Sequence, residues 1–213
     1  MSNDALVDGL IVDLKPTRQL SRQAEMLILA GLAALQVFIV LTLHGMRPDM
    51  PMAMAQPSIW WKGASLAIIA LISAIAAVRS FVPTESARSG LRLLIPTIAA
   101  VLAVGLLIDA GAAGIGSLIE RLDWHNGLAC MEQVVMLAMP AILVLGVMMR
   151  RGAATDPQAT ALAVGVAAAA WGGFIFVFNC PHDDPLYTIV WYSASVAAIA
   201  LAGRIVLPLL TRW

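Results

Sequence analysis

Six long apolar stretches constrain this chain more than any other feature of its sequence. Each approaches the roughly 20 residues that an α-helix needs to cross the hydrocarbon core of a bilayer, and short turns rich in Pro, Gly and charge separate them. Of the 213 residues, 61% are hydrophobic and 12% are charged, which is more apolar surface than a soluble core of this size could bury. The predicted spans run approximately over Glu25–Leu43, Trp61–Val78, Leu93–Ile108, Ala129–Met149, Gln158–Phe178 and Tyr187–Leu207.

These spans predict an all-α fold, a polytopic membrane bundle of about six transmembrane helices. The third span is short, so we expect it to extend at either end. Residues 23–213 would form the transmembrane domain, and residues 1–22 a short amphipathic cytoplasmic tail. The tail is polar at its start and the first apolar run is too long for a signal peptide, so no cleavable leader is expected.

The distribution of Lys and Arg predicts the orientation of the bundle. Nine basic residues fall in the N-terminal tail, the second and fourth loops and the C-terminal tail, whereas Arg47, Lys62 and Arg121 alone fall on the opposite side. Basic segments remain in the cytoplasm. We therefore expect a bacterial inner-membrane protein with both termini in the cytoplasm and with loops one, three and five in the periplasm.

Two cysteines lie close to the predicted periplasmic ends of spans four and five. Because a short loop joins these spans, they should be antiparallel neighbours, and Cys130 and Cys180 should approach each other at the surface. An exposed pair in an oxidising compartment can be a structural staple, or it can sense oxidants. With His125 and His182 nearby in the sequence, the thiols could also bind a thiophilic metal.

The first loop is rich in methionine and contains a histidine. Thioether ligands suit Cu(I), so this loop is a second candidate metal site. The alternative is that the methionines are apolar filler on the membrane surface. The candidate ligands are His44, Met46, Met50, Met52 and Met54.

The N-terminal tail carries an apolar stripe at helical spacing and ends at Pro16. Its opposite face is acidic, which favours a protein partner over the anionic cytoplasmic leaflet. The alternative is that the helix folds back onto the cytoplasmic loops. The stripe consists of Leu6, Val7, Leu10, Ile11 and Leu14.

Several classes of function are disfavoured. A net charge of zero gives no indication of direct nucleic-acid binding. No span carries a charge at its middle, and the chain has neither a Gly-rich phosphate-binding motif nor a Ser/His/Asp arrangement. We therefore expect neither a proton-driven pump, an ATPase nor a hydrolase, and we expect the chain not to be an enzyme.

The whole chain resembles the NrsF family, the negative regulators of sigma F. The resemblance is most specific over residues 179–187, which look like the family's Cys-Pro signature with its following Asp and aromatic residues, and it continues at Trp191-Tyr192. Asp13–Pro16 and Arg150–Ala153 support it, whereas the Met-rich first loop is not a hallmark of the family. The resemblance implies an inner-membrane anti-sigma factor that binds an extracytoplasmic-function sigma factor through residues 1–22.

The resemblance also implies that Cys130 and Cys180 are the periplasmic cysteines of the family. Sequence and resemblance together predict that these cysteines sense metal or oxidative stress and cause release of the sigma factor. No cofactor is certain, but a thiophilic metal ion such as copper at the periplasmic face is a candidate. The alternatives are a membrane thiol-disulfide oxidoreductase, which would normally need two cysteine pairs, and a small metal transporter, which would need ligands at midspan.

Overall fold

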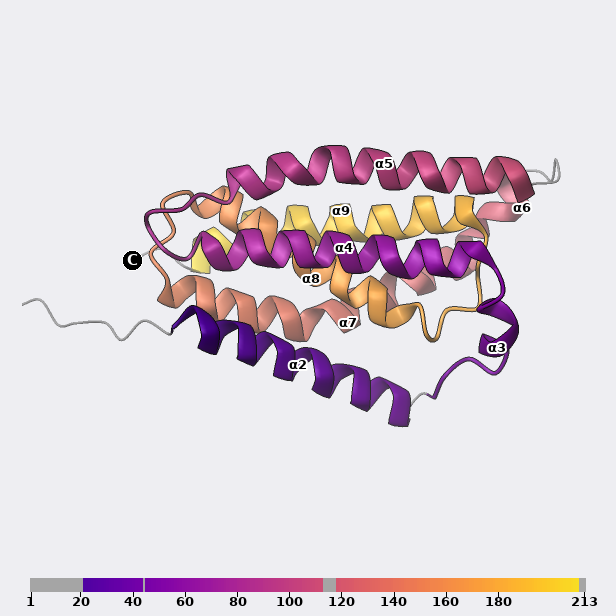
Figure 1. The fold of residues 1–213 in the computed structure, drawn as a ribbon, viewed down its shortest axis with the longest axis horizontal. Coiled ribbons are helices and arrows are strands. Elements are labelled where there is room, and N and C mark those ends of the chain that lie inside the picture. The colour runs from indigo at the N-terminus through magenta and orange to yellow at the C-terminus, as the bar shows by residue number, and fades with distance from the viewer. Residues whose placement is uncertain (1–20, 44, 113–117, 211–213) are drawn as a thin grey trace, which may run out of the picture.

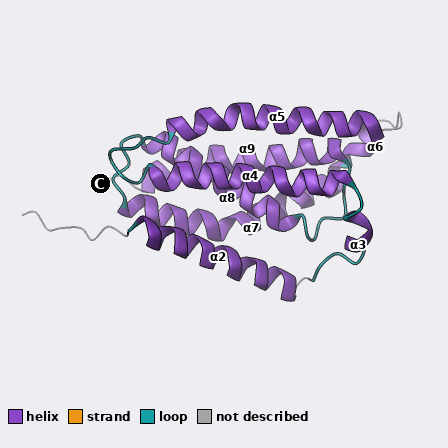
Figure 2. Ribbon diagram, in the orientation of Figure 1, coloured by secondary structure: helices purple, strands orange, loops and turns teal. Residues whose placement is uncertain are grey.

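The computed structural model describes residues 21–43, 45–112 and 118–210, and all regular structure in these ranges is helical (Figure 2). Six helices are long and apolar enough to cross a membrane, which confirms the predicted polytopic bundle. They are α2 (Arg22–Leu43), α4 (Pro57–Arg79), α5 (Arg88–Ala112), α7 (Trp124–Arg151), α8 (Pro157–Phe176) and α9 (Pro185–Leu210), with two short helices, α3 (Met50–Ala53) and α6 (Leu118–Leu122), between them.

The starts of the long helices follow from local sequence. Pro57, Pro157 and Pro185 each occupy the first helical position, where proline's fixed φ suits the helix and its missing N–H costs nothing. The Asp156 side chain accepts a hydrogen bond from the Ala159 backbone N–H at 3.1 Å and so caps α8. The third span, expected over residues 93–108, extends at both ends into the 25-residue helix α5.

Helix α8 lies at the centre of the bundle and packs against α4, α7 and α9 (Figure 1). Its small residues let neighbouring backbones approach closely, which is how helices associate in a bilayer. A Cβ atom placed on Gly165 would lie 2.8 Å from the Cα of Ala200 in α9, and one on Gly172 would lie 2.7 Å from the backbone N of Ala138 in α7. The helix therefore has no room for larger side chains at these positions.

Several polar side chains within the spans find partners inside the protein, because the lipid core offers none. Ser73 and Ser195 donate to the carbonyl oxygens four residues earlier, at 2.5 and 2.7 Å. Gln36 of α2 donates to the Leu137 carbonyl oxygen at 2.5 Å and accepts from the Trp171 indole N–H at 3.0 Å.

The helices alternate in direction, so the loops collect at two ends of the bundle (Figure 1). We call one end the tail end: it contains the start of α2, the end of α9 and the turns at residues 80–87 and 152–156. Its ion pairs are exposed, with side-chain exposures of 53% for Arg22, 59% for Arg79 and 70% for Arg88. We call the opposite end, which contains residues 45–56 and 177–184, the cysteine end.

Candidate thiol site

Both cysteines lie at the cysteine end, and both are buried. Helix α7 begins at Trp124, so Cys130 lies within its second turn, and Cys180 follows the end of α8 by four residues. Cys130 is 4% exposed and Cys180 is 1% exposed. The expectation of an exposed pair was wrong, because Met50 and Ala53 of α3 and Tyr187 of α9 join the same apolar cluster.

The structure brings the two thiols together. Each cysteine side chain lies within hydrogen-bonding reach of the other. Tyr187 lies beside Cys130 and Tyr192 beside Cys180. Within the described ranges neither tyrosine hydroxyl forms a hydrogen bond of ordinary geometry, although both are buried. The sulfur atoms are therefore the polar neighbours of these hydroxyl groups.

A buried lysine adjoins this cluster. Lys62, near the start of α4, is 1% exposed, and its Nζ donates to the His182 carbonyl oxygen at 3.0 Å. The same ammonium lies 4.7 Å from the centre of the Tyr192 ring, at cation–π distance. In the part of the chain that the structure describes, no carboxylate forms an ion pair with it. Sequence counting had treated Lys62 only as a marker of orientation.

The surroundings of Cys180 favour its thiolate form. The Cys130 thiol can donate a hydrogen bond to the Cys180 sulfur, which lowers the pKa of Cys180. Burial opposes this effect, but the Lys62 ammonium adds to it by attraction between opposite charges. A thiolate is the nucleophilic and metal-binding form of cysteine, so the site favours thiol chemistry at Cys180.

Two arginines hold the segment that follows Cys180. The first is Arg47, whose guanidinium donates to the Cys180 carbonyl oxygen at 2.6 Å and to both carboxylate oxygens of Asp183 at 2.8 and 2.6 Å. It also binds Asp49 at 2.8 and 2.6 Å. The Arg47 side chain is 5% exposed, so this double ion pair is shielded from water.

The second arginine approaches from the other side of the segment. Arg121 of α6 donates to the two Asp184 oxygens at 2.9 and 3.0 Å and also binds Asp109 of α5. Asp184 in turn accepts from the Tyr187 backbone N–H at 3.1 Å and so caps α9. One turn later, the Trp191 indole N–H donates to the Leu122 carbonyl oxygen at 2.7 Å.

Arg47, Lys62 and Arg121 are the three basic residues that lie on the predicted periplasmic side, opposite the other nine. All three contact the segment from Cys180 to Asp184. Sequence reasoning missed this role. A signal was present, because the loops on this side of the bundle also carry Asp49, Asp183 and Asp184, and buried charges need opposite partners.

The histidines predicted as ligands do not gather around the thiols. The His182 ring stacks on Tyr187 with ring centres 4.6 Å apart, and His125 is exposed. Across the described residues, no three His, Cys, Asp or Glu side chains are grouped as metal ligands would be. The metal site at Cys130, Cys180, His125 and His182 therefore stays a prediction.

The other predicted sites are either dispersed or not described. Met50 is buried in the apolar core, whereas Met46, Met52 and Met54 are exposed. His44 and the partner-binding stripe of the tail, Leu6 to Leu14, lie outside the described residues.

The described features define a polytopic helical membrane protein with a buried thiol pair and a cluster of ion pairs at one end of its bundle. The family model of NrsF, negative regulator of sigma F, matches residues 10–213, nearly the whole chain, and the chain belongs to this family. No curated protein and no solved structure matches it. The family name implies a sigma factor as partner and a regulatory rather than enzymatic role.

Proposed function

We propose that this protein is an anti-sigma factor that holds an extracytoplasmic-function sigma factor at the bacterial inner membrane and releases it when Cys130 and Cys180 react. The observation that carries the proposal is the contact between two thiols beside a buried ammonium, at the end of the bundle away from the start of α2. Family membership supports the sigma-factor partner.

The proposed orientation puts both termini in the cytoplasm. The nine basic residues of the tail-end segments support it, because basic loops are retained on the cytoplasmic side. The thiol pair then faces the periplasm, where thiols can be oxidised or can meet metal ions. The apolar stripe of residues 6–14 binds the sigma factor on the cytoplasmic side.

The proposed stimulus changes the bonding between the two sulfurs. With hydrogen peroxide as oxidant, the two thiols give up two electrons and two protons, a disulfide forms, and the hydrogen peroxide becomes two molecules of water. A thiophilic metal ion such as Cu(I) would instead bridge the sulfurs and displace the thiol protons. Either reaction replaces the contact between the Cys130 and Cys180 thiols with a covalent or a coordinate link between the two sulfurs.

The test of sensing compares Cys130→Ser, Cys180→Ser and the double variant in cells that report sigma-factor activity. If the thiols act as one unit, each single variant is as insensitive to peroxide and copper as the double variant. Wild-type induction in both single variants would show that the signal enters elsewhere. His125→Ala and His182→Ala separate the two chemistries, because a Cys–His metal site predicts loss of the copper response alone.

The test of docking uses Leu10→Asp, which places a carboxylate on the apolar stripe of the tail. Burying that carboxylate unpaired costs several kcal/mol, at least about 3, so the sigma factor should be released without any stimulus. Asp8→Asn, on the acidic face, is the matched control and should retain the sigma factor. Retention by a chain that lacks residues 1–16 would rule out this binding site.

A further inference from the structure

We propose that Arg47 is a positioning residue that fastens α2 to the segment carrying Cys180, so that the thiols control where α2 lies. The inference rests on the proposed function, because it explains how a reaction at the cysteines reaches the helix that follows the N-terminal tail. It depends on how α2 is held, on what Arg47 contacts and on how Arg121 differs.

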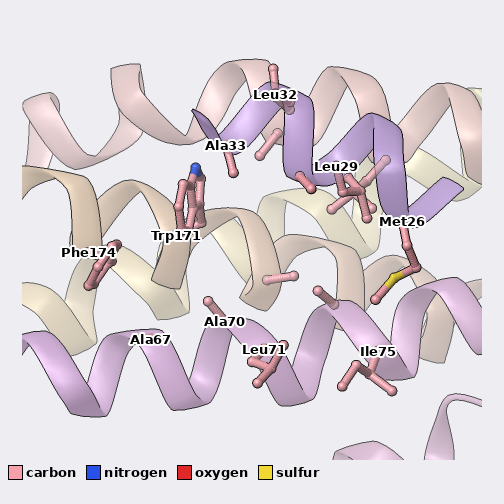
Figure 3. Close-up of a pocket in the computed structure, with 15 residues that line it drawn as sticks. Met26, Leu29, Leu32, Ala33, Ala67, Ala70, Leu71, Ile75, Trp171 and Phe174 are labelled. Atoms are coloured by element: carbon pink, nitrogen blue, oxygen red, sulfur yellow. The ribbon is translucent and has the colours of Figure 1, made fainter. Parts of the chain in front are cut away.

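Helix α2 packs weakly against the rest of the bundle. Only 11% of its most apolar stretch is buried. An apolar groove of about 420 Å³ separates it from α4 and α8, and Met26 and Leu29 of α2 face Leu71 and Trp171 across this space (Figure 3). Because few side chains interlock here, shifting α2 would disturb little apolar packing.

Polar contacts hold α2 at three heights instead. At the tail end, Arg22 pairs with Glu85 at 2.5 Å. Near the middle of the helix, Gln36 bridges to the Leu137 carbonyl oxygen and to Trp171. At the cysteine end, the fastening comes from residues 45–47, which follow the last turn of α2.

The fastening at the cysteine end is the most extensive of the three. The Asn179 side-chain amide donates to the Gly45 carbonyl oxygen at 2.8 Å, and the Arg47 backbone N–H donates to the Phe178 carbonyl oxygen at 3.1 Å. The Arg47 guanidinium adds the bonds to the Cys180 carbonyl oxygen and to Asp183. The chain just beyond α2 is therefore attached on both sides of Cys180.

Burial makes this attachment stiff. The side chain of Arg47 is 5% exposed and that of Asp183 is 12% exposed, so neither charge can move into water without breaking the pair. A reaction that pulls Cys180 toward Cys130 moves the Cys180 carbonyl oxygen and Asp183 together. Arg47 must follow or lose its partners, and the end of α2 lies only four residues away.

Arg121 provides the contrast. It clamps the same segment with the same kind of double ion pair, but it joins Asp184 to Asp109 of α5. Arg121 lies on α6, which follows α5. Loss of Arg121 should therefore loosen the Cys180 segment without releasing α2.

The experiment measures spin-label distances in the full-length protein in lipid nanodiscs. Labels carried on non-natural amino acids leave the thiols free. One pair joins Leu35 of α2 to Leu201 of α9, and a reference pair joins Leu143 of α7 to Leu201; all three positions are exposed, at 56%, 61% and 56% for Leu35, Leu143 and Leu201. The variants are Arg47→Gln, Asp183→Asn and, as matched control, Arg121→Gln.

We expect Arg47→Gln and Asp183→Asn each to shift or broaden the Leu35–Leu201 distances while the reference pair stays as in the wild type, which also shows that the bundle is folded. Arg121→Gln should leave both distances unchanged. Peroxide should shift the Leu35–Leu201 distances of the wild type and have no further effect on Arg47→Gln. Wild-type distances in both Arg47→Gln and Asp183→Asn, or an equal shift in Arg121→Gln, would overturn the inference.

The proposed function fails in a different way. If Arg47→Gln moves α2 but the cells still retain the sigma factor, the fastening is real and the link from α2 to the partner is wrong. If Arg47→Gln releases the sigma factor without moving α2, Arg47 acts by another route and the inference is overturned while the anti-sigma function stands.

Discussion

Helices α8 and α2 have nearly the same length, 20 and 22 residues, yet the bundle holds them in opposite ways. Most of helix α8 is buried, and its glycines let the backbones of α7 and α9 approach its own backbone closely. Helix α2 presents large side chains such as Leu35 and Phe38 to the lipid and is held by polar contacts at three heights.

The difference shows how one bundle can be both rigid and responsive. Close backbone packing has many contacts that must be lost together, whereas a few polar contacts can be broken one at a time. The helix that follows the N-terminal tail, α2, is the one held by a few polar contacts. Substitutions that disrupt close backbone packing should therefore lower stability far more than substitutions that remove one polar contact.

The largest effect is expected from Gly172→Leu in α8. A Cβ atom there would lie 2.7 Å from the Ala138 nitrogen and 2.8 Å from the Val134 carbonyl oxygen. These are backbone atoms, which cannot rotate away as a flexible side chain can. Forced separation of α7 from α8 should cost about 3 kcal/mol or more. Size-exclusion chromatography and thermal unfolding in detergent should show aggregation or a large loss of stability.

The same substitution at Gly31 in α2 is the control, because no atom lies within 4 Å of a Cβ placed there. If Gly172→Leu proved as stable as Gly31→Leu, α8 would not be held by backbone contact.

An intermediate effect is expected from Gln36→Leu, which removes the middle attachment of α2. The Trp171 indole N–H would lose its partner, and the Leu137 carbonyl oxygen would lose a second hydrogen bond. Interhelical hydrogen bonds in membranes contribute about 0.6–2 kcal/mol. The free energy of unfolding, measured by thermal unfolding, should fall by that amount. Helix α2 should also become more accessible to proteolysis near residue 22. Thr42→Val, which loses only bonds within α2, is the control.

A smaller effect is expected at the tail end, where Glu85 joins Arg79 and Arg22. Hydrogen bonds from Arg79 and then Arg22 lower the pKa of Glu85 from 4.5. Its contribution is therefore complete above pH 4.5 and is lost as the pH falls through the lowered value. Spin-label distances across the start of α2 should broaden on acidification or in high salt, and Glu85→Gln should abolish this dependence.

The smallest effect, of opposite sign, is expected from Gly31→Ala. The added methyl group meets no neighbour, and alanine favours the helix over glycine by about 0.5–1 kcal/mol. The midpoint of thermal unfolding should rise slightly, and the sigma factor should be retained as in the wild type. A clear loss of stability would mean that α2 packs against a surface that the structure does not show.

Much of the fold could be predicted from the sequence, because helices in lipid must satisfy their own backbone and so follow apolar length directly. The six spans and the pairing of α7 with α8 are of this kind. The burial of Cys130 and Cys180 was not predictable, because it depends on side chains from three helices that meet only in the folded bundle. The position of Lys62 was equally hidden: near a helix start, a lysine is normally read as a residue that reaches for water.

The burial of the two cysteines, at 4% and 1% exposure, has a kinetic consequence. Because side chains of α3 and α9 cover them, a reagent should reach them only when this end of the bundle opens, so modification should proceed through a rare open state. At low reagent concentration the rate should follow the reagent's own reactivity. At high concentration it should level off at the opening frequency, and unrelated reagents small enough to enter should then share one limiting rate. The extent of reaction would thus depend on how long a chemical stress persists. During a brief pulse, even a strong oxidant would leave most of the thiols unmodified.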